Sequence, residues 1–139
     1  MILNEALRLF PPVVDQSREV VMDVKLGDLD IPKGSILYFP RLSIHHDPEL
    51  WGTDVHEFKP ERFANGVAKA TKHPLAFMPF SFGPRFCVGQ GFAMEEVKSI
   101  LVVILRRFRF QLSSNYRHGP CSWDTLKPKY GVPVMLESL

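Results

Sequence analysis

Apolar residues recur at helical spacing in the first nine positions and predict a short helix over residues 1–9. The residues between them are good helix formers, and Pro11 and Pro12 end the helix because proline lacks an amide hydrogen. No capping residue precedes Met1, so we expect the chain to start partway through an element.

Residues 18–46 carry a strand-like pattern instead. Short apolar runs are separated by turn residues at 27–28 and 32–34, which predicts a small antiparallel sheet. Asp47 and Pro48 then predict a single helical turn, with Asp47 as the N-cap and Pro48 in the first helical position.

Residues 53–86 show no sustained period and include several prolines, so we expect irregular structure. An irregular segment of this length in a compact domain is usually functional or disordered, and its many phenylalanines argue against disorder.

The clearest helical pattern covers residues 89–108. Its second half is apolar nearly all round, which predicts a deeply buried helix. Without the neighbours that should cover it, the helix would expose a patch prone to aggregation. A last hairpin is predicted to pair residues 125–127 with residues 132–136 across Tyr130 and Gly131.

Composition and charge narrow the class of protein. The 139 residues are about one small domain, and a hydrophobic fraction of 45% with 23% charged residues excludes a disordered tail. A net charge of +2 gives no basic stripe for nucleic acid, and the basic cluster at 106–109 fits a helix C-terminus. No apolar run reaches the ~20 residues of a membrane span.

Metal and disulfide patterns are weak. Cys87 and Cys121 lie far apart and match neither a disulfide framework nor a metal knuckle, and so few cysteines suggest a reducing compartment. His45, His46 and His56 have no spacing typical of zinc ligands.

Residues 80–89 read FSFGPRFCVG and fit the pattern F-x-x-G-x-R-x-C-x-G, which rarely occurs by chance. A cysteine just before a helix faces unpaired amide groups and the positive end of the helix dipole, which favours the thiolate. Taken alone, Cys87 would more often be a buried structural cysteine beside an aromatic cluster.

This segment resembles the haem-binding loop of cytochrome P450. The resemblance implies that the cofactor is haem b and that Cys87 is the axial ligand of its iron. It also implies that Arg85 pairs with a haem propionate and that Phe80 shields the thiolate from water. Gly83 and Gly89 would let the backbone turn and approach the porphyrin closely.

Two further motifs match the same family. Glu5 and Arg8 fit E-x-x-R, and residues 60–63 read PERF. An i, i+3 pair alone means little, because exposed helical pairs contribute only about 0.2–0.5 kcal/mol. The resemblance implies that Glu5, Arg8 and Arg62 form a buried network that holds the irregular segment beneath the haem. Loss of one partner would then cost about 3–5 kcal/mol.

The order and spacing of these motifs extend the resemblance over essentially the whole chain. The expected fold is α+β, the C-terminal part of a cytochrome P450 fold that is mainly α in the parent. Its expected parts are the E-x-x-R helix, a small antiparallel sheet, an irregular meander, the cysteine loop, a long buried helix and a C-terminal hairpin. Segments such as 44–52 and 127–131 are most similar to plant microsomal P450s of the clan acting on isoprenoid hormones, terpenoids and fatty acids.

Residues that would contact the substrate follow from the same resemblance. They are Val13, Val14, Asp15, Cys121, Ser122 and Trp123. Asp15 is unusual for an apolar pocket and indicates either a polar substrate or a turn residue. Arg18 lies where the family often has a basic residue on a propionate, although a surface position is equally compatible.

The resemblance implies a haem-thiolate monooxygenase that hydroxylates a lipophilic small molecule with O₂ and electrons from NADPH-cytochrome P450 reductase. Lys98 and Arg106 are candidates for docking the acidic reductase. We expect residues 1–139 to be a fragment, without the membrane anchor, distal pocket and oxygen-activation helix of a parent on the cytosolic face of the endoplasmic reticulum. The alternatives are a truncated or pseudogene-type chain without activity, or a module that only binds haem.

Overall fold

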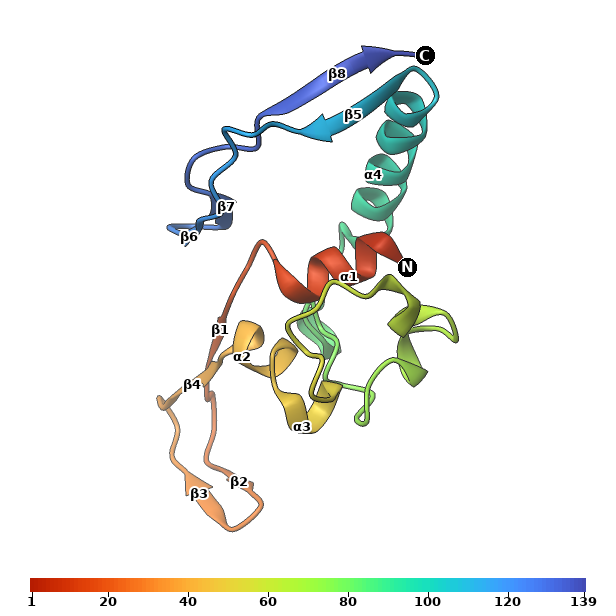
Figure 1. The fold of residues 1–139 in the computed structure, drawn as a ribbon. Helices are drawn as coiled ribbons and strands as arrows, with labels where there is room; N and C mark the ends of the chain where they lie inside the picture. The colour runs from red at the N-terminus through yellow and green to blue at the C-terminus, as the bar shows by residue number, and fades with distance from the viewer. The chain divides into compact units, whose positions relative to one another are not determined.

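The computed structural model describes residues 1–139 and divides into two compact units, residues 1–79 and residues 80–139 (Figure 1). The first unit contains α1 (Ile2–Leu9), β1 (Gln16–Glu19), β2 (Val24–Leu26), β3 (Leu29–Ile31), β4 (Ile36–Phe39), α2 (Arg41–His45), α3 (Pro48–Trp51) and the 3₁₀ turns Pro60–Phe63 and Val67–Lys69. The second unit contains the 3₁₀ turn Gly83–Arg85, α4 (Gln90–Leu105), β5 (Phe108–Leu112), β6 (Pro120–Ser122), β7 (Leu126–Pro128) and β8 (Val134–Ser138).

The first helix confirms the sequence prediction. Helix α1 ends before the two prolines, and the amide of Phe10 closes its last turn on the carbonyl oxygen of Ala6 at 2.8 Å. Its buried residues are Glu5, Arg8 and Leu9, so the helix turns a charged pair toward the interior together with an apolar residue.

The predicted antiparallel pairing is confirmed, but the strands form two separate pairs. β1 pairs with β4 and β2 pairs with β3, each antiparallel. The first strand also begins earlier than predicted, at Gln16 instead of Arg18. Beyond β1, Val20 extends the contact by two backbone hydrogen bonds, from its amide to Ser35 and from Gly34 to its carbonyl.

Helix α3 has the predicted cap: the side chain of Asp47 accepts a hydrogen bond from the amide of Glu49 at 2.8 Å, and Pro48 opens the helix. The segment that follows is irregular as predicted, with only short 3₁₀ turns. It contributes to the apolar core of the first unit, which consists of Trp51, Val55, Phe63, Ala70 and Ala76.

The second unit contradicts the prediction of a deeply buried helix. No residue of α4 is buried, and Ile100, Val102 and Val103 are each more than half exposed. Helix α4 contacts β5 of its own unit, and most residues of this largely apolar helix are exposed. No helix is long and apolar enough to cross a membrane.

The predicted last hairpin is wrong. β7 pairs with β6, and β8 pairs with β5 over five residue pairs from Phe108↔Ser138 to Leu112↔Val134. The reason is that Pro133 has no amide hydrogen to donate across the predicted hairpin, whereas β5 offers β8 a longer uninterrupted ladder.

Candidate functional site

A buried charged network lies at the centre of the first unit. Arg8 holds Glu5 through two parallel hydrogen bonds of 2.8 Å, from Nε to Oε2 and from Nη2 to Oε1, and both side chains have no exposed surface. Its Nη1 donates to the carbonyl oxygens of His45 at 3.0 Å and Val55 at 2.7 Å. Arg8 therefore ties α1 to two segments distant in sequence.

The third predicted member of the network joins it at longer range. The Nε atom of Arg62 lies 3.6 Å from Oε1 of Glu5, within ion-pair range but too far for a hydrogen bond. Nη1 of Arg62 donates to the carbonyl oxygen of Trp51 at 2.8 Å, and Nη2 lies 3.0 Å from Oδ1 of Asp54. The structure thus brings Glu5, Arg8 and Arg62 together and adds Asp54, which sequence reasoning did not identify.

The pKa values of the two carboxyl groups follow from these contacts. Burial raises the pKa of Glu5, but the hydrogen bonds from Arg8 and from the Lys59 amide, with the charges of Arg8 and Arg62, bring it below its usual value. Hydrogen bonds from Lys59 and Arg62 lower the pKa of Asp54 to about 2. Both groups are therefore carboxylates at neutral pH.

His45, which the sequence analysis weighed only as a zinc ligand, is a buried structural side chain next to the network. It is fully buried, and its Nδ1 lies 3.2 Å from the carbonyl oxygen of Arg8 while its Nε2 lies 3.1 Å from the amide nitrogen of Met78. Since a carbonyl needs a donor and an amide needs an acceptor, the ring is neutral with its hydrogen on Nδ1. Burial lowers the pKa of His45 to about 4.

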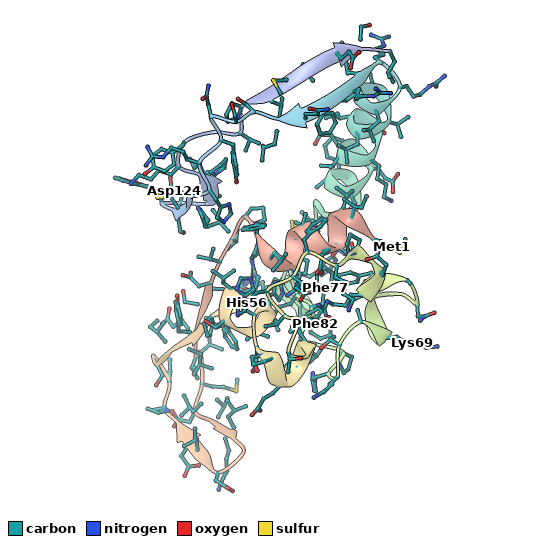
Figure 2. The ribbon with its side chains drawn as sticks, in the orientation of Figure 1. Met1, His56, Lys69, Phe77, Phe82 and Asp124 are labelled. Atoms are coloured by element: carbon teal, nitrogen blue, oxygen red, sulfur yellow. The ribbon has the colours of Figure 1, made fainter.

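His45 also belongs to an aromatic cluster in the first unit. Its ring stacks on Phe77 at 5.7 Å between centroids, and Trp51 meets it edge-on at 6.3 Å. Figure 2 shows Phe77 among the side chains of this interior. The sequence signal that could have identified His45 is its place two residues before the Asp47 cap, but its partners lie 37 and 33 residues away.

The cysteine loop belongs to the second unit and is closed by backbone hydrogen bonds. The amide of Cys87 donates to the carbonyl oxygen of Phe80 at 2.8 Å, and the amide of Phe86 donates to Gly83 at 3.0 Å. Gly83 has a φ of +74°, a conformation that favours glycine, and the preceding turn residue Ser81 also has a positive φ of +67°. The loop therefore holds Cys87 at a defined place directly before α4.

The side chain of Cys87 is exposed at the N-terminus of this helix. Gly89 is the N-cap of α4 with a φ of −81°, so its backbone does not require glycine. A Cβ atom at Gly89 would lie 3.8 Å from Sγ of Cys87, which is an ordinary van der Waals contact. Of the two predicted glycines, only Gly83 has a backbone angle that favours glycine.

These residues fit a haem with a thiolate ligand. Cys87 is exposed, and the exposed Arg85 makes no ion pair within the chain, so that it can bind an anionic propionate. Phe80 is half-buried and contributes its carbonyl oxygen to the loop. The arrangement defines a candidate haem-thiolate site.

The remaining predicted residues lie in both units. Val13, Val14, Asp15 and Arg18 belong to the first unit, where Val13 is 46% exposed and the other three are half-buried. Cys121 and Ser122 lie on β6 of the second unit and Trp123 follows them at the hairpin tip, where it is 88% exposed. Figure 2 labels the adjacent Asp124 at this tip.

Comparison with known proteins identifies the family. The family model of cytochrome P450 matches residues 1–130. Cytochrome P450 709B1 of Arabidopsis thaliana is 50% identical over 140 residues, which cover 100% of this chain and 27% of that protein. The 7-deoxyloganic acid hydroxylase of Catharanthus roseus and the 11-oxo-beta-amyrin 30-oxidase of Glycyrrhiza uralensis are each 50% identical over 139 residues, with the same coverage.

A solved structure gives the same result. Retinoic acid-bound cyanobacterial CYP120A1 matches with a TM-score of 0.88 and 32% identity, covering 99% of this chain and 32% of that one. The chain belongs to the cytochrome P450 family, and it spans 27% of the length of these plant relatives.

Proposed function

We propose that this chain supplies the haem ligand and its supporting scaffold to a haem-thiolate monooxygenase that hydroxylates a lipophilic small molecule. The observation that carries the proposal is the exposed residue Cys87 at the N-terminus of α4, in a loop closed by the hydrogen bond from its own amide to the carbonyl oxygen of Phe80. Helix N-termini favour anionic groups, so this position suits a thiolate that binds iron.

Each residue of the loop has its own proposed role in binding the cofactor. Cys87 would bind the iron, Arg85 would bind one propionate, Phe80 would shield the sulfur, and Gly83 and Gly89 would let the backbone turn and approach the cofactor closely. When bound, haem b supplies the O₂ activation that no amino-acid side chain provides. Arg18, on β1 of the first unit, is a second candidate for a propionate.

The buried network has a supporting role in this proposal. Glu5, Arg8 and Arg62 fasten α1 to the irregular segment that leads to Pro79, directly before the loop. His45 continues this support, because its contact with the amide of Met78 fixes the backbone one residue before Pro79.

The substrate class is proposed from the relatives. The hydroxylase and the oxidase named above act, by their names, on 7-deoxyloganic acid and 11-oxo-beta-amyrin. A lipophilic plant metabolite is therefore the proposed substrate, with contacts from Val13, Val14 and Asp15 and from the hairpin residues Cys121, Ser122 and Trp123.

The proposed electron donor is NADPH-cytochrome P450 reductase, at the endoplasmic reticulum membrane. Lys98 and Arg106 on and after α4 are the proposed docking cations. Lys98 is already paired with Glu95 at 2.6 Å, so Arg106 is the more available of the two.

A second candidate is a chain that has no catalytic activity by itself. The observation that favours it is that no residue between Phe80 and Leu139 is buried, so the second unit lacks a core of its own.

A chimera tests the first proposal. The segment of 7-deoxyloganic acid hydroxylase that aligns with this chain, 27% of that enzyme, is replaced by residues 1–139. We expect hydroxylation of 7-deoxyloganic acid that is lost in Cys87→Ser and retained in the matched variant Cys121→Ser. An inactive chimera would contradict the proposal.

A further inference from the structure

Arg41, the first residue of α2, is a buried cation that holds a neighbouring stretch of the first unit. Only 4% of it is exposed. Its Nη1 donates to the carbonyl oxygen of Val13 at 2.7 Å, and its Nη2 donates to Oε1 of Gln16 at 3.4 Å. The guanidinium is therefore hydrogen-bonded to the first and the last residue of the stretch 13–16. This stretch is called the 13–16 segment below.

Two more hydrogen bonds hold the middle of this segment. The amide of Leu42 donates to the carbonyl oxygen of Val14 at 2.8 Å. The hydroxyl of Tyr38 donates to Oδ2 of Asp15 at 2.6 Å. The carboxylate of Asp15 therefore already has a hydrogen-bond partner within the protein.

Arg41 makes these contacts at a cost to the folded state. Burial lowers the pKa of Arg41, although the carboxylate of Asp15 acts in the opposite direction, and its Nε has no hydrogen-bond partner in the chain. The hydrogen bonds from Arg41 to Val13 and Gln16 offset this cost, and both bonds end on residues 13–16.

We propose that Arg41, assisted by Tyr38, is a positioning residue that fixes the backbone of the 13–16 segment. By fixing this backbone, Arg41 would lower the KM of the enzyme for its substrate. The consequence for substrate rests on the proposed function, because that function assigns Val13 and Val14 to the substrate pocket. Neither Arg41 nor Tyr38 needs to touch the substrate.

Amide hydrogen exchange in the full chain tests the positioning role. The reporter is the amide of Leu42, which is bonded to the segment itself, and the reference is the amide of Trp51 in the core, which is bonded to Asp47. In Arg41→Met we expect the Leu42 amide to exchange about tenfold faster or more, as for the loss of a charged hydrogen bond, with the Trp51 amide unchanged.

Graded variants separate positioning from general stabilisation. Arg41→Lys keeps the charge and a single donor nitrogen in place of the guanidinium, and it should restore part of the protection. Tyr38→Phe should give a smaller acceleration. Lys25→Met on exposed β2 removes the same charge and should change neither amide. Equal acceleration at Leu42 and Trp51, or none at Leu42, would overturn the positioning role.

The chimera with 7-deoxyloganic acid hydroxylase supplies the substrate readout. Arg41→Met should raise KM for 7-deoxyloganic acid several-fold while kcat and haem content stay unchanged. A fall in kcat and haem content at unchanged KM would overturn the link to substrate. If the chimera with Arg41 intact is inactive, the proposed function fails, and the exchange result still decides whether Arg41 holds the segment.

Discussion

Two ion pairs with the same i, i+3 spacing occupy opposite environments in the two units. Glu5 and Arg8 on α1 meet at 2.8 Å with both side chains fully buried, whereas Glu95 and Lys98 on α4 meet at 2.6 Å with more than half of each side chain exposed. The buried pair is surrounded by the carbonyl oxygens of His45, Val55 and Glu57, which accept from Arg8. Spacing along a helix sets which side chains meet, and the surrounding backbone sets what the contact contributes to stability.

Removing the cation from each pair should give the largest difference in stability loss between the two sites. Arg8→Met leaves Glu5 buried without its partner and should lower the free energy of unfolding of the first unit by about 3–5 kcal/mol. Lys98→Met should change stability by no more than about 0.5 kcal/mol. Urea unfolding followed by Trp51 fluorescence measures the first, and circular dichroism of α4 measures the second. Similar losses at both sites would remove the distinction between the units.

Shortening an apolar side chain in each unit should give a smaller difference in stability loss between the two units. Val55 in the core is 2% exposed and Val103 on α4 is 53% exposed. Val55→Ala should cost roughly 2 kcal/mol, from lost burial and the cavity left behind. Val103→Ala should change stability by less than about 0.5 kcal/mol, because its side chain already contacts water. Equal costs in urea titrations would mean that α4 is covered in solution.

Acid should lower the free energy of unfolding of the first unit through His45. The expected change for each pH unit is smaller than the losses predicted for Arg8→Met and Val55→Ala. The pKa of this ring is about 4 in the folded protein and 6.5 for an unperturbed histidine, so the unfolded chain binds the proton first as pH falls. Its contribution is therefore present above pH 6.5 and is lost toward pH 4, by up to about 1.4 kcal/mol per pH unit. Unfolding titrations across this range should show the slope reduced in His45→Asn. The exposed His73→Asn is the control, and an unchanged slope in His45→Asn would assign the acid response to other groups.

The features that the sequence predicted correctly depend on neighbouring residues. Asp47 and Pro48 cap α3 through a contact two residues away, and the pattern around Cys87 places that residue before α4. Both follow from local chemistry, which a short stretch of sequence contains in full.

The features that were missed depend on distant partners. β8 pairs with β5 across more than twenty residues, and His45 meets Arg8 and Met78 at separations of 37 and 33 residues. Apolar periodicity also predicted a buried α4, because the pattern reports how apolar a helix is and not which surfaces cover it. The role of Arg41 was missed for the same reason, since its contacts depend on residues 13–16.

The ligand role of Cys87 is the central claim and has a direct spectroscopic test. The chain is loaded with haem and reduced, carbon monoxide is added, and the Soret band is recorded. We expect the band of a thiolate–carbon monoxide complex, absent in Cys87→Ser and retained in Cys121→Ser. A chain that takes up haem without this band, or a band that survives Cys87→Ser, would contradict the assignment of Cys87 as the iron ligand.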